Sequence, residues 1–450
     1  SLPTLWGLMA QFFTRISIAL CDVLMIHQPS PSGPTMRLLV TTTGTVVTHA
    51  HTDETLLLDG ADILVESGVI ASIAPSQELV QEFDADGIAA SNLEVLNVGR
   101  RSVIPGLIDA HTHLIWAGDR SDEVGKRLSG MSYHDIAAQG GGIGRTVRAT
   151  AEATVDDLRR IGIKRASIAH RSGTTYLEAK SGYGLETQAE LNQIQAAHET
   201  GSVEGLPGVH ATWLGAHAIP QDHTEEQTVE RLLSEQLPSV IEQGYAQSAD
   251  VFCEPGWFSV DSTERIMNEA MARGLSGRLH IDEFVDSGGA ILAAELGVVT
   301  ADHTLKTSGV GRQALADAEV ITGYLPGTPH MLGMDMPNIP ATPGPFTLAS
   351  DFNPNCPSLS LPFAASLAVH RAGVTPQAAL AAVTSTAAMS VPRADGLKHG
   401  VLEPGAAGSL NVLAGESWEG WCLSPGHDPF QWTVVDGHVT QHENSLHVAQ

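Results

Sequence analysis

From residue 103 onward, short apolar runs alternate with segments of helical periodicity, and no other feature of the sequence constrains the fold as strongly. The intervening segments include VDDLRRIGIKRASIAHR, QAELNQIQAAHET and DSTERIMNEAMARG. This alternation is typical of βαβ units in a parallel sheet. Eight repeats of it predict a (β/α)8 barrel of the TIM type rather than an open sheet. The eight runs are VIPGLIDAH, TTYLEAK, VHATWLGAH, DVFCE, GRLHIDE, GVVTADH, VITGYLP and FTLASD.

The segments on either side of the predicted barrel have a different pattern. Residues 36–103 contain short strand-like stretches with glycine and aspartate at the turns, and residues 391–450 return to short strands. We expect these two segments to form one small discontinuous β-sandwich domain, with the barrel over 104–390. Residues 1–35 precede the first convincing strand pattern and are expected to be an extension outside the fold.

Polar side chains stand at or just after the carboxyl ends of the predicted barrel strands. Barrel enzymes build their active sites on that face, so this placement predicts a catalytic site there. The residues are His111, Lys180, His217, Glu254, Glu283, His303 and Asp351.

His111 and His113 form a His-x-His pair at the end of the first apolar run. Side chains at i and i+2 of an extended segment share a face, so both imidazoles can reach one metal ion. A second such pair, His49 and His51, lies in a polar, threonine-rich stretch and is not expected to bind metal.

Strands five and eight supply further ligands for a catalytic metal, namely His280 and Asp351. A catalytic ion takes three or four nitrogen and oxygen ligands and leaves a position for water, whose pKa it lowers toward neutrality. We therefore expect one divalent or trivalent ion, zinc or iron, since both accept these ligands. The nucleophile is then a metal-activated hydroxide.

Three residues are candidates for moving protons and charge in such a site. Glu283, in the HIDE motif, is the candidate proton shuttle, and Asp351 is placed to assist it. His303 is the candidate for polarising a carbonyl group or stabilising an oxyanion, although a lone buried histidine is often structural. Asp282 is expected to brace neighbouring backbone.

The charge of the chain excludes nucleic acid as a partner. The formal net charge is −27, from 51 acidic and 24 basic residues, and such a surface repels phosphates. The acidic surface is interpreted either as a solvated shell that keeps the protein dispersed or as adaptation to a salt-rich cytoplasm.

Cysteine usage and hydropathy indicate a soluble cytoplasmic protein that does not enter membranes. The sequence has no apolar stretch long enough to span a bilayer and no convincing signal peptide. Its four cysteines are scattered without CxxC pairs, so neither a disulfide framework nor a zinc ribbon is indicated. They are Cys21, Cys253, Cys356 and Cys422.

Several motifs in one order resemble a known family over residues 36 to the C-terminus: PGLIDAHTHLIWAGDR, SYHDIAAQGGGI, EAKSGYGLE, LGAHAIP, HIDEFVDSGGA, ADH, LPGTP and ASDFNP. HTH and HxDE are shared widely among metal-dependent amidohydrolases and deaminases, whereas GGGI, KSGYGLE, GAHAIP and DFNP are narrower. Together they resemble imidazolonepropionase, the amidohydrolase-superfamily enzyme that opens the imidazolone ring in histidine degradation.

The resemblance implies one zinc or iron ion bound by His111, His113, His280 and Asp351, the same set that the strand ends indicate. Because it implies a single metal, Lys180 is assigned to structure or electrostatics and not to the carbamylated lysine of binuclear relatives. It further implies a homodimer that acts on a small-molecule substrate.

Positions that hold the substrate in the family match Arg120, Tyr183 and His217. A propionate tail suits a bidentate guanidinium, so Arg120 is the predicted carboxylate clamp; a surface pair with Asp119 or Asp122 is the structural alternative. Tyr183 and His217 are expected to hydrogen-bond the tail or the ring.

Two further positions bear on substrate contacts. Glu283 matches the family residue that contacts the ring and handles protons, and Asn353 follows Asp351 closely enough to reach a ligand. The sequence departs from the family where Asn355 and Cys356 precede the next proline in place of a glycine and a small hydroxyl residue.

The predicted reaction is hydrolysis of the cyclic amide of 4-imidazolone-5-propanoate to N-formimino-L-glutamate. The first alternative is a cytosine-deaminase-like aminohydrolase acting on a nucleobase or related heterocycle, which would leave Arg120 without a carboxylate to hold. The second is a non-catalytic metal- or metabolite-binding protein on the same barrel.

Overall fold

The computed structural model describes residues 36–51, 53–86, 93–131, 135–136 and 139–443. The predicted extension over 1–35 lies outside the described residues, so that prediction stays untested.

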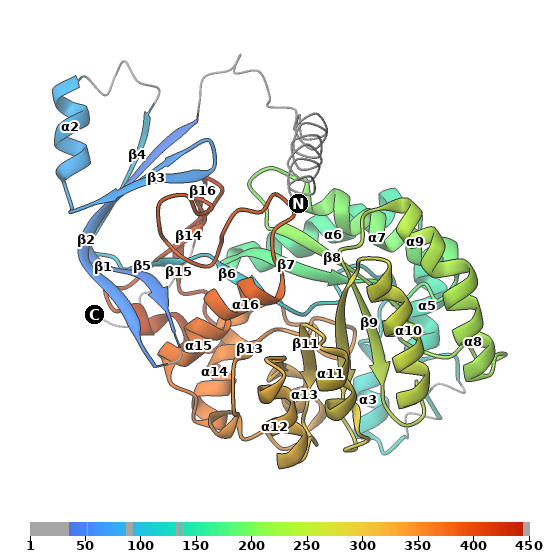
Figure 1. The fold of residues 1–450 in the computed structure, drawn as a ribbon. Coiled ribbons are helices and arrows are strands. Elements are labelled where there is room, and N and C mark those ends of the chain that lie inside the picture. The colour runs from blue at the N-terminus through green and yellow to red at the C-terminus, as the bar shows by residue number, and fades with distance from the viewer. Residues whose placement is uncertain (1–35, 52, 87–92, 132–134, 137–138, 444–450) are drawn as a thin grey trace, which may run out of the picture. The chain divides into compact units, whose positions relative to one another are not determined.

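All eight apolar runs contribute a strand to one parallel barrel sheet, which confirms the predicted barrel (Figure 1). Its strand order follows the chain from β6 to β13. The strands are β6 (Leu107–Asp109), β7 (Thr174–Lys180), β8 (Gly208–Ala216), β9 (Ser248–Cys253), β10 (Ser276–Ile281), β11 (Thr300–His303), β12 (Ile321–Tyr324) and β13 (Phe346–Leu348).

Helices lie between these strands and after the last of them, and pack their apolar sides on the barrel. Helix α6 begins where the sequence provides a capping box, in which the Thr154 hydroxyl accepts from Asp157 N and the Asp157 carboxylate accepts from Thr154 N. The helices are α3 (Asp122–Leu128), α5 (Gly142–Glu152), α6 (Val155–Arg171), α7 (Thr187–Gly201), α8 (Glu225–Arg231), α9 (Leu237–Gln243), α10 (Val260–Ala272), α11 (Gly289–Leu296), α12 (Gly309–Asp317), α13 (Gly327–Leu332), α14 (Leu361–Ala372), α15 (Pro376–Ala382) and α16 (Ser385–Ser390).

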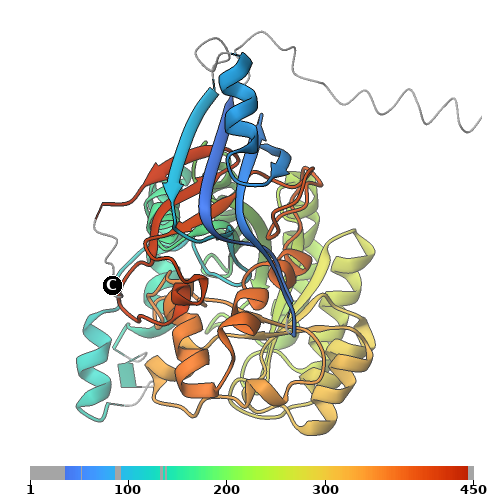
Figure 2. The ribbon, with the colours of Figure 1, turned by 90° about the vertical axis from the view of Figure 1, so that its left-hand side faces the viewer.

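A second, mixed sheet joins strands from both ends of the described chain (Figure 2). It branches at β1, which pairs with β4 along its first half and with β5 further on. Side chains from both branches share one buried core. The strands are β1 (Arg37–Ala50), β2 (Thr55–Glu66), β3 (Val69–Ala74), β4 (Leu93–Gly99), β5 (Val103–Pro105), β14 (Leu410–Leu413), β15 (Phe430–Val435) and β16 (His438–Gln441), with helix α2 (Glu78–Asp86) between β3 and β4.

The first predicted barrel strand, VIPGLIDAH, is in fact two strands in different sheets. Its first part is β5, which pairs with β14 of the mixed sheet, and its second part is β6 of the barrel. Gly106 lies at the crossing. A Cβ atom there would stand 2.2 Å from the Thr175 hydroxyl oxygen, so only glycine permits this close approach.

The chain just beyond β6 and β13 closes the barrel. Thr112 and Phe352 form a parallel bridge, the His113 amide donates to the Phe352 carbonyl at 2.9 Å, and the Asp351 amide donates to the His111 carbonyl at 3.0 Å. The seam between the first and last barrel strands is therefore built from the predicted metal ligands and their neighbours.

The cysteines and the lengths of the helices bear on the expectations about disulfides and membrane spans. The described cysteines, Cys253, Cys356 and Cys422, are buried and free of disulfides, while Cys21 lies outside the described residues. In the same part of the chain, every helix is too short or too polar to cross a membrane.

Candidate metal centre and active site

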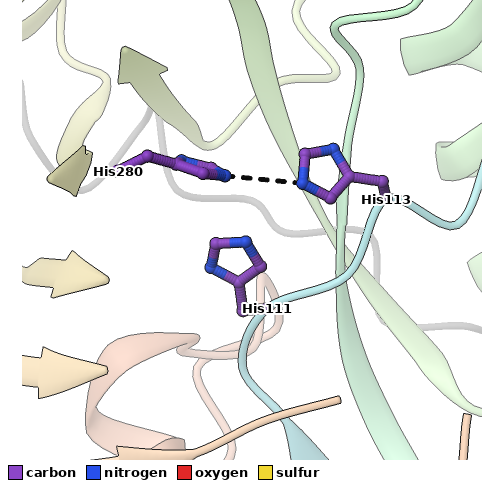
Figure 3. Close-up of side chains that lie close together, drawn as sticks. All are labelled: His111, His113 and His280. Carbon is purple, nitrogen blue, oxygen red and sulfur yellow. Dashed lines mark hydrogen bonds between the residues drawn. The ribbon is translucent and has the colours of Figure 1, made fainter. Parts of the chain in front are cut away.

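The three histidines predicted as ligands point toward one another at the carboxyl ends of the barrel strands (Figure 3). His111 and His113 follow β6, and His280 lies in β10. The Nε2 atoms of His113 and His280 are 3.4 Å apart. Asp351 lies against two of them, because its Oδ1 atom is 3.5 Å from His111 Nε2 and 3.7 Å from His113 Nε2.

These spacings fit a metal ion. Four ligands about 2.1 Å from a tetrahedral ion lie about 3.4 Å from one another. Three of the six separations, 3.4, 3.5 and 3.7 Å, are close to this value, whereas His280 and Asp351 belong to two different potential metal groups that share His111. Among the described residues, His111 Nε2 and Asp351 Oδ1 are buried and have no hydrogen-bond partner. Burying such atoms without a partner is costly, so their donor set suits a cation.

Carboxylates stand behind two of these imidazoles. His111 Nδ1 is hydrogen-bonded to Asp302 Oδ2 at 2.8 Å, and His280 Nδ1 lies 3.0 Å from Asp250 Oδ2. A carboxylate at Nδ1 orients the ring and leaves the Nε2 lone pair for a metal. Burial, above all, lowers the pKa of His111 and His113 well below the usual value, so both rings are neutral, as ligands must be.

Lys180 lies beneath the centre in a buried network of charges. Its Nζ atom is 2.6 Å from Asp250 Oδ2, 2.8 Å from the Glu178 carboxylate and 3.9 Å from Asp302 Oδ2. Arg278 Nε lies 2.9 Å from Glu178 on the other side. Burial opposes the charge of Lys180, but Asp250 and Glu178 outweigh it and raise the pKa of Lys180.

Asp351 is held in a strained backbone conformation. Its φ angle is +49°, and that of His303 is +70°; positive φ is costly for residues with a Cβ and is often found at active sites. The Oδ2 atom of Asp351 accepts a hydrogen bond from the Thr328 hydroxyl of the LPGTP motif. This bond leaves Oδ1 directed at the histidines.

Glu283 and His303 lie next to each other beside the metal centre. The Glu283 Oε2 atom is 3.8 Å from His303 Nε2, and His303 belongs to a group with His111 and Asp351 whose ligand atoms lie within 4.8 Å of one another. Burial, followed by the charge of Asp351, raises the pKa of Glu283 well above the usual value.

Glu254 fixes the loop that carries Glu283. Its carboxylate accepts backbone hydrogen bonds from Glu283 at 3.1 Å, Phe284 at 3.1 Å and Val285 at 2.8 Å. The strand-end pattern included Glu254 but gave it no role, and this contact supplies one.

Arg120 is buried and does not form the surface pair that was the structural alternative. Its Nε atom donates to Glu123 Oε2 at 3.0 Å, and one Nη2 hydrogen bond goes to Asn355 Oδ1 at 3.2 Å. The other Glu123 oxygen accepts a hydrogen bond from the Gly142 amide at 2.8 Å. Gly142 belongs to the GGGI motif at residues 140–143, here called the glycine-rich loop. Glu123 thus joins the guanidinium to that loop, while Asn355 joins it to the turn after Asp351.

Tyr183 and His217 lie beside the metal centre, and their contact with a substrate stays a prediction. The His217 ring stacks on His113 with centroids 5.0 Å apart, and Tyr183 lies 5.1 Å from His217 and 5.7 Å from His113. His217 Nδ1 donates to the Gly182 carbonyl at 2.9 Å, which leaves Nε2 of the neutral ring as an acceptor. Phe252, 6.2 Å from His217, adds an apolar neighbour.

Two predicted side chains serve local structure. Asn353 donates to the Asp351 carbonyl at 2.8 Å and accepts from the Asn355 amide at 2.8 Å, so both ends of its amide bind within one turn; its substrate contact stays a prediction. Asp282 accepts from the Thr307 hydroxyl at 2.6 Å and from a backbone amide, which confirms its bracing role.

The His49–His51 pair lies apart from any potential metal group found in the described residues. His49 Nε2 lies 3.0 Å from Glu403 Oε2. The expectation that the pair does not bind metal stays a prediction.

Sequence reasoning missed four partners of the site: Asp250, Asp302, Thr328 and Glu123. A signal existed for the first two, since DVFCE and GVVTADH place an acidic residue inside an otherwise apolar barrel strand. Buried carboxylates require partners, and strand ends close to a metal site provide them. Thr328 and Glu123 lie on helices outside the barrel strands and carried no such signal.

Three histidines and an aspartate that converge at the carboxyl ends of a (β/α)8 barrel define a metal-dependent hydrolase of the amidohydrolase type. Solved structures share this fold. A triazine hydrolase variant aligns with a TM-score of 0.66 at 16% identity, covering 90% of this chain and 94% of that one. A guanine deaminase from C. acetobutylicum with bound guanine aligns with a TM-score of 0.66 at 13% identity, covering 90% and 99%.

The atrazine chlorohydrolase of Arthrobacter aurescens TC1, solved with zinc and atraton, aligns with a TM-score of 0.65 at 16% identity, covering 92% of this chain and 97% of that one. No family model matches the chain. Curated relatives, in contrast, match most of its length.

The chain belongs to the imidazolonepropionase family. It is 40% identical over 383 residues to the imidazolonepropionase of Haloarcula marismortui, covering 84% of this chain and 88% of that protein. It is 39% identical over 366 residues to that of Geobacillus kaustophilus, covering 79% and 84%.

Proposed function

We propose that this protein hydrolyses 4-imidazolone-5-propanoate to N-formimino-L-glutamate, a step of histidine degradation. The observation that carries the proposal is the gathering of His111, His113, His280 and Asp351 at the carboxyl ends of the barrel strands, in two overlapping groups that share His111, in a chain of the imidazolonepropionase family. The buried Arg120 supplies a cation for the propanoate.

The four converging residues are the proposed ligands of one metal ion. When bound, such an ion lowers the pKa of water and polarises a carbonyl group, so that a nucleophile is available at neutral pH. Asp351 keeps Oδ1 on the centre because Thr328 occupies its other oxygen. Zinc and iron both accept this donor set, and the choice between them belongs to metal analysis.

Glu283 is the proposed proton shuttle. Hydrolysis requires a proton to leave the attacking water and another to reach the departing ring nitrogen. Glu283 is buried, and its Oε2 atom lies near His303 Nε2, so one carboxyl group can perform both transfers in turn. His303 stabilises the negative charge that develops on the carbonyl oxygen.

Arg120 is the proposed carboxylate clamp, with Tyr183 and His217 contacting the substrate between clamp and metal. Glu123 holds the guanidinium on its Nε side, so the clamp is ordered before the substrate arrives. An ordered guanidinium loses little side-chain entropy on binding a carboxylate.

The test follows the imidazolone absorbance with purified, metal-loaded protein and identifies the product as substrate plus one water. We expect turnover by the natural chain, a large loss of kcat in Glu283→Gln, and a raised KM in Arg120→Met. A charged hydrogen bond contributes about 1.5–3 kcal/mol, which corresponds to about a 10- to 150-fold effect on kcat/KM. Full turnover by Glu283→Gln would remove that residue from the mechanism.

The same proteins, assayed also for ammonia release from a nucleobase and for binding of the imidazolone, separate the two alternatives. A cytosine-deaminase-like enzyme releases ammonia from a nucleobase and does not depend on Arg120, because a neutral base has no carboxylate. A non-catalytic binding protein would bind the imidazolone in the metal-loaded state without turnover. Either outcome would overturn the proposed reaction.

The resemblance also leads us to propose a homodimer in the cytoplasm that binds no nucleic acid. The net charge of −27 supports the last point. Sedimentation analysis at working concentration tests the oligomeric state, and a monomeric protein with full activity would refute it.

A further inference from the structure

We infer that Lys180 is a positioning residue of the metal centre, because its ammonium group ties together the two carboxylates that hold the His111 and His280 imidazoles. The inference rests on the metal centre of the proposed function and is independent of the substrate. It assigns a task to a buried charge that the mechanism leaves unused.

The first step of the argument is the pair of contacts to the imidazoles. Asp302 Oδ2 lies 2.8 Å from His111 Nδ1, and Asp250 Oδ2 lies 3.0 Å from His280 Nδ1. Each carboxylate fixes the orientation of one ring. For His113, by contrast, the carboxylate contact found among the described residues is at Nε2, to Asp351, and not at Nδ1. A carboxylate at Nδ1 therefore orients two of the three imidazole rings, those of His111 and His280.

The second step is that one cation reaches both carboxylates. Lys180 Nζ lies 2.6 Å from the same Asp250 oxygen that faces His280, and 3.9 Å from the same Asp302 oxygen that faces His111. Asp250 lies in β9 and Asp302 in β11, on either side of β10. Without Lys180, the positive charge that balances these two carboxylates would be lost. Like charges at such distances repel strongly in a buried site.

The third step is that Lys180 is fixed in place. The exposed fraction of its side chain is 0%, and its ammonium group donates hydrogen bonds to Asp250 Oδ2 at 2.6 Å and to Glu178 Oε1 at 2.8 Å. Conversion to a carbamate would place a further anion among three carboxylates. The geometry thus explains why a lysine at this strand end braces a one-metal site and does not bridge two metals.

The test measures metal affinity, with zinc as the probe and a chromophoric chelator as the competitor. We expect Asp302→Asn and Asp250→Asn to weaken zinc binding by about 10- to 100-fold, as is usual for groups that orient metal ligands. The Co²⁺-substituted variants should also show shifted visible absorption bands. Asp62→Asn is the matched control, because Asp62 is equally buried but binds Thr41 and backbone amides of α2 in the mixed sheet.

Lys180→Met leaves buried acids uncompensated and is at risk of misfolding, so the decisive variant is Lys180→Met with Asp250→Asn, which removes one positive and one negative charge together. If Lys180 also supports Asp302, this double variant binds zinc several-fold more weakly than Asp250→Asn alone. Equal affinity of the two, with identical Co²⁺ spectra, would overturn the inference. A protein that binds zinc normally but does not open imidazolone would instead contradict the proposed function.

Discussion

Replacing Glu254 by glutamine should separate the positioning of Glu283 from the binding of metal. The Glu254 carboxylate accepts three backbone hydrogen bonds, two at Oε1 and one, from the Glu283 amide, at Oε2. Glutamine keeps one acceptor oxygen and turns an NH2 group toward an amide that can only donate. A hydrogen bond to a charged group contributes about 1.5–3 kcal/mol, so we expect the free energy of unfolding to fall by about that amount.

We expect the same substitution to slow catalysis by a similar amount of free energy. Displacing a reacting group by 1 Å can cost about 100-fold in rate, so we expect kcat of Glu254→Gln to fall by about 10- to 100-fold while zinc affinity stays unchanged. Initial rates from imidazolone absorbance and chelator competition measure the two quantities, with Asp62→Asn as a control for the loss of a buried carboxylate elsewhere. An unchanged kcat in a destabilised variant would show that Glu254 supports only the loop.

Three further outcomes are expected. Glu123→Gln should raise KM about tenfold and change kcat less, because it weakens the hold on Arg120 Nε; steady-state kinetics that show the reverse would contradict the clamp. Thr328→Val should weaken zinc binding about tenfold in chelator competition, because it removes the hydroxyl that occupies Asp351 Oδ2; unchanged affinity would count against it. His210 is a buried histidine of β8. In His210→Asn, the free energy of unfolding should fall less steeply as the pH is lowered. Burial lowers the pKa of His210 from 6.5 to about 3 in the folded protein, so the unfolded chain binds the proton first, and His210 costs about 2 kcal/mol of stability at pH 5. Denaturant titrations at pH 7 and pH 5 measure the slope, and parallel curves for both proteins would refute the assignment.

The barrel could be predicted from the sequence because buried parallel strands and their helices differ in period, and all eight runs stood out. The gathering of the proposed ligands at one end of the barrel could be predicted for the same reason, because the strand ends meet at one face. The boundary at Gly106 could not be predicted, because one continuous apolar run crosses between two sheets and only the packing of Thr175 shows where.

The carboxylates that contact the proposed metal ligands and Arg120 could not be predicted, because their pairing depends on three-dimensional geometry. Which acid stands behind His111 is decided by barrel register, and Asp302 is distant from it in the chain. Arg120 had acidic neighbours at Asp119 and Asp122, but the turn of α3 gives it Glu123 instead. Sequence spacing alone did not distinguish these pairings.

The seam of the barrel links catalysis to completion of the chain. The histidines beside the first barrel strand and Asp351 beside the last are synthesised far apart, and only a finished barrel brings them within reach of one ion. An unfinished chain that ends before β13 has neither the closing wall nor the carboxylate. We therefore expect the complete set of proposed ligands to form only once the barrel has closed.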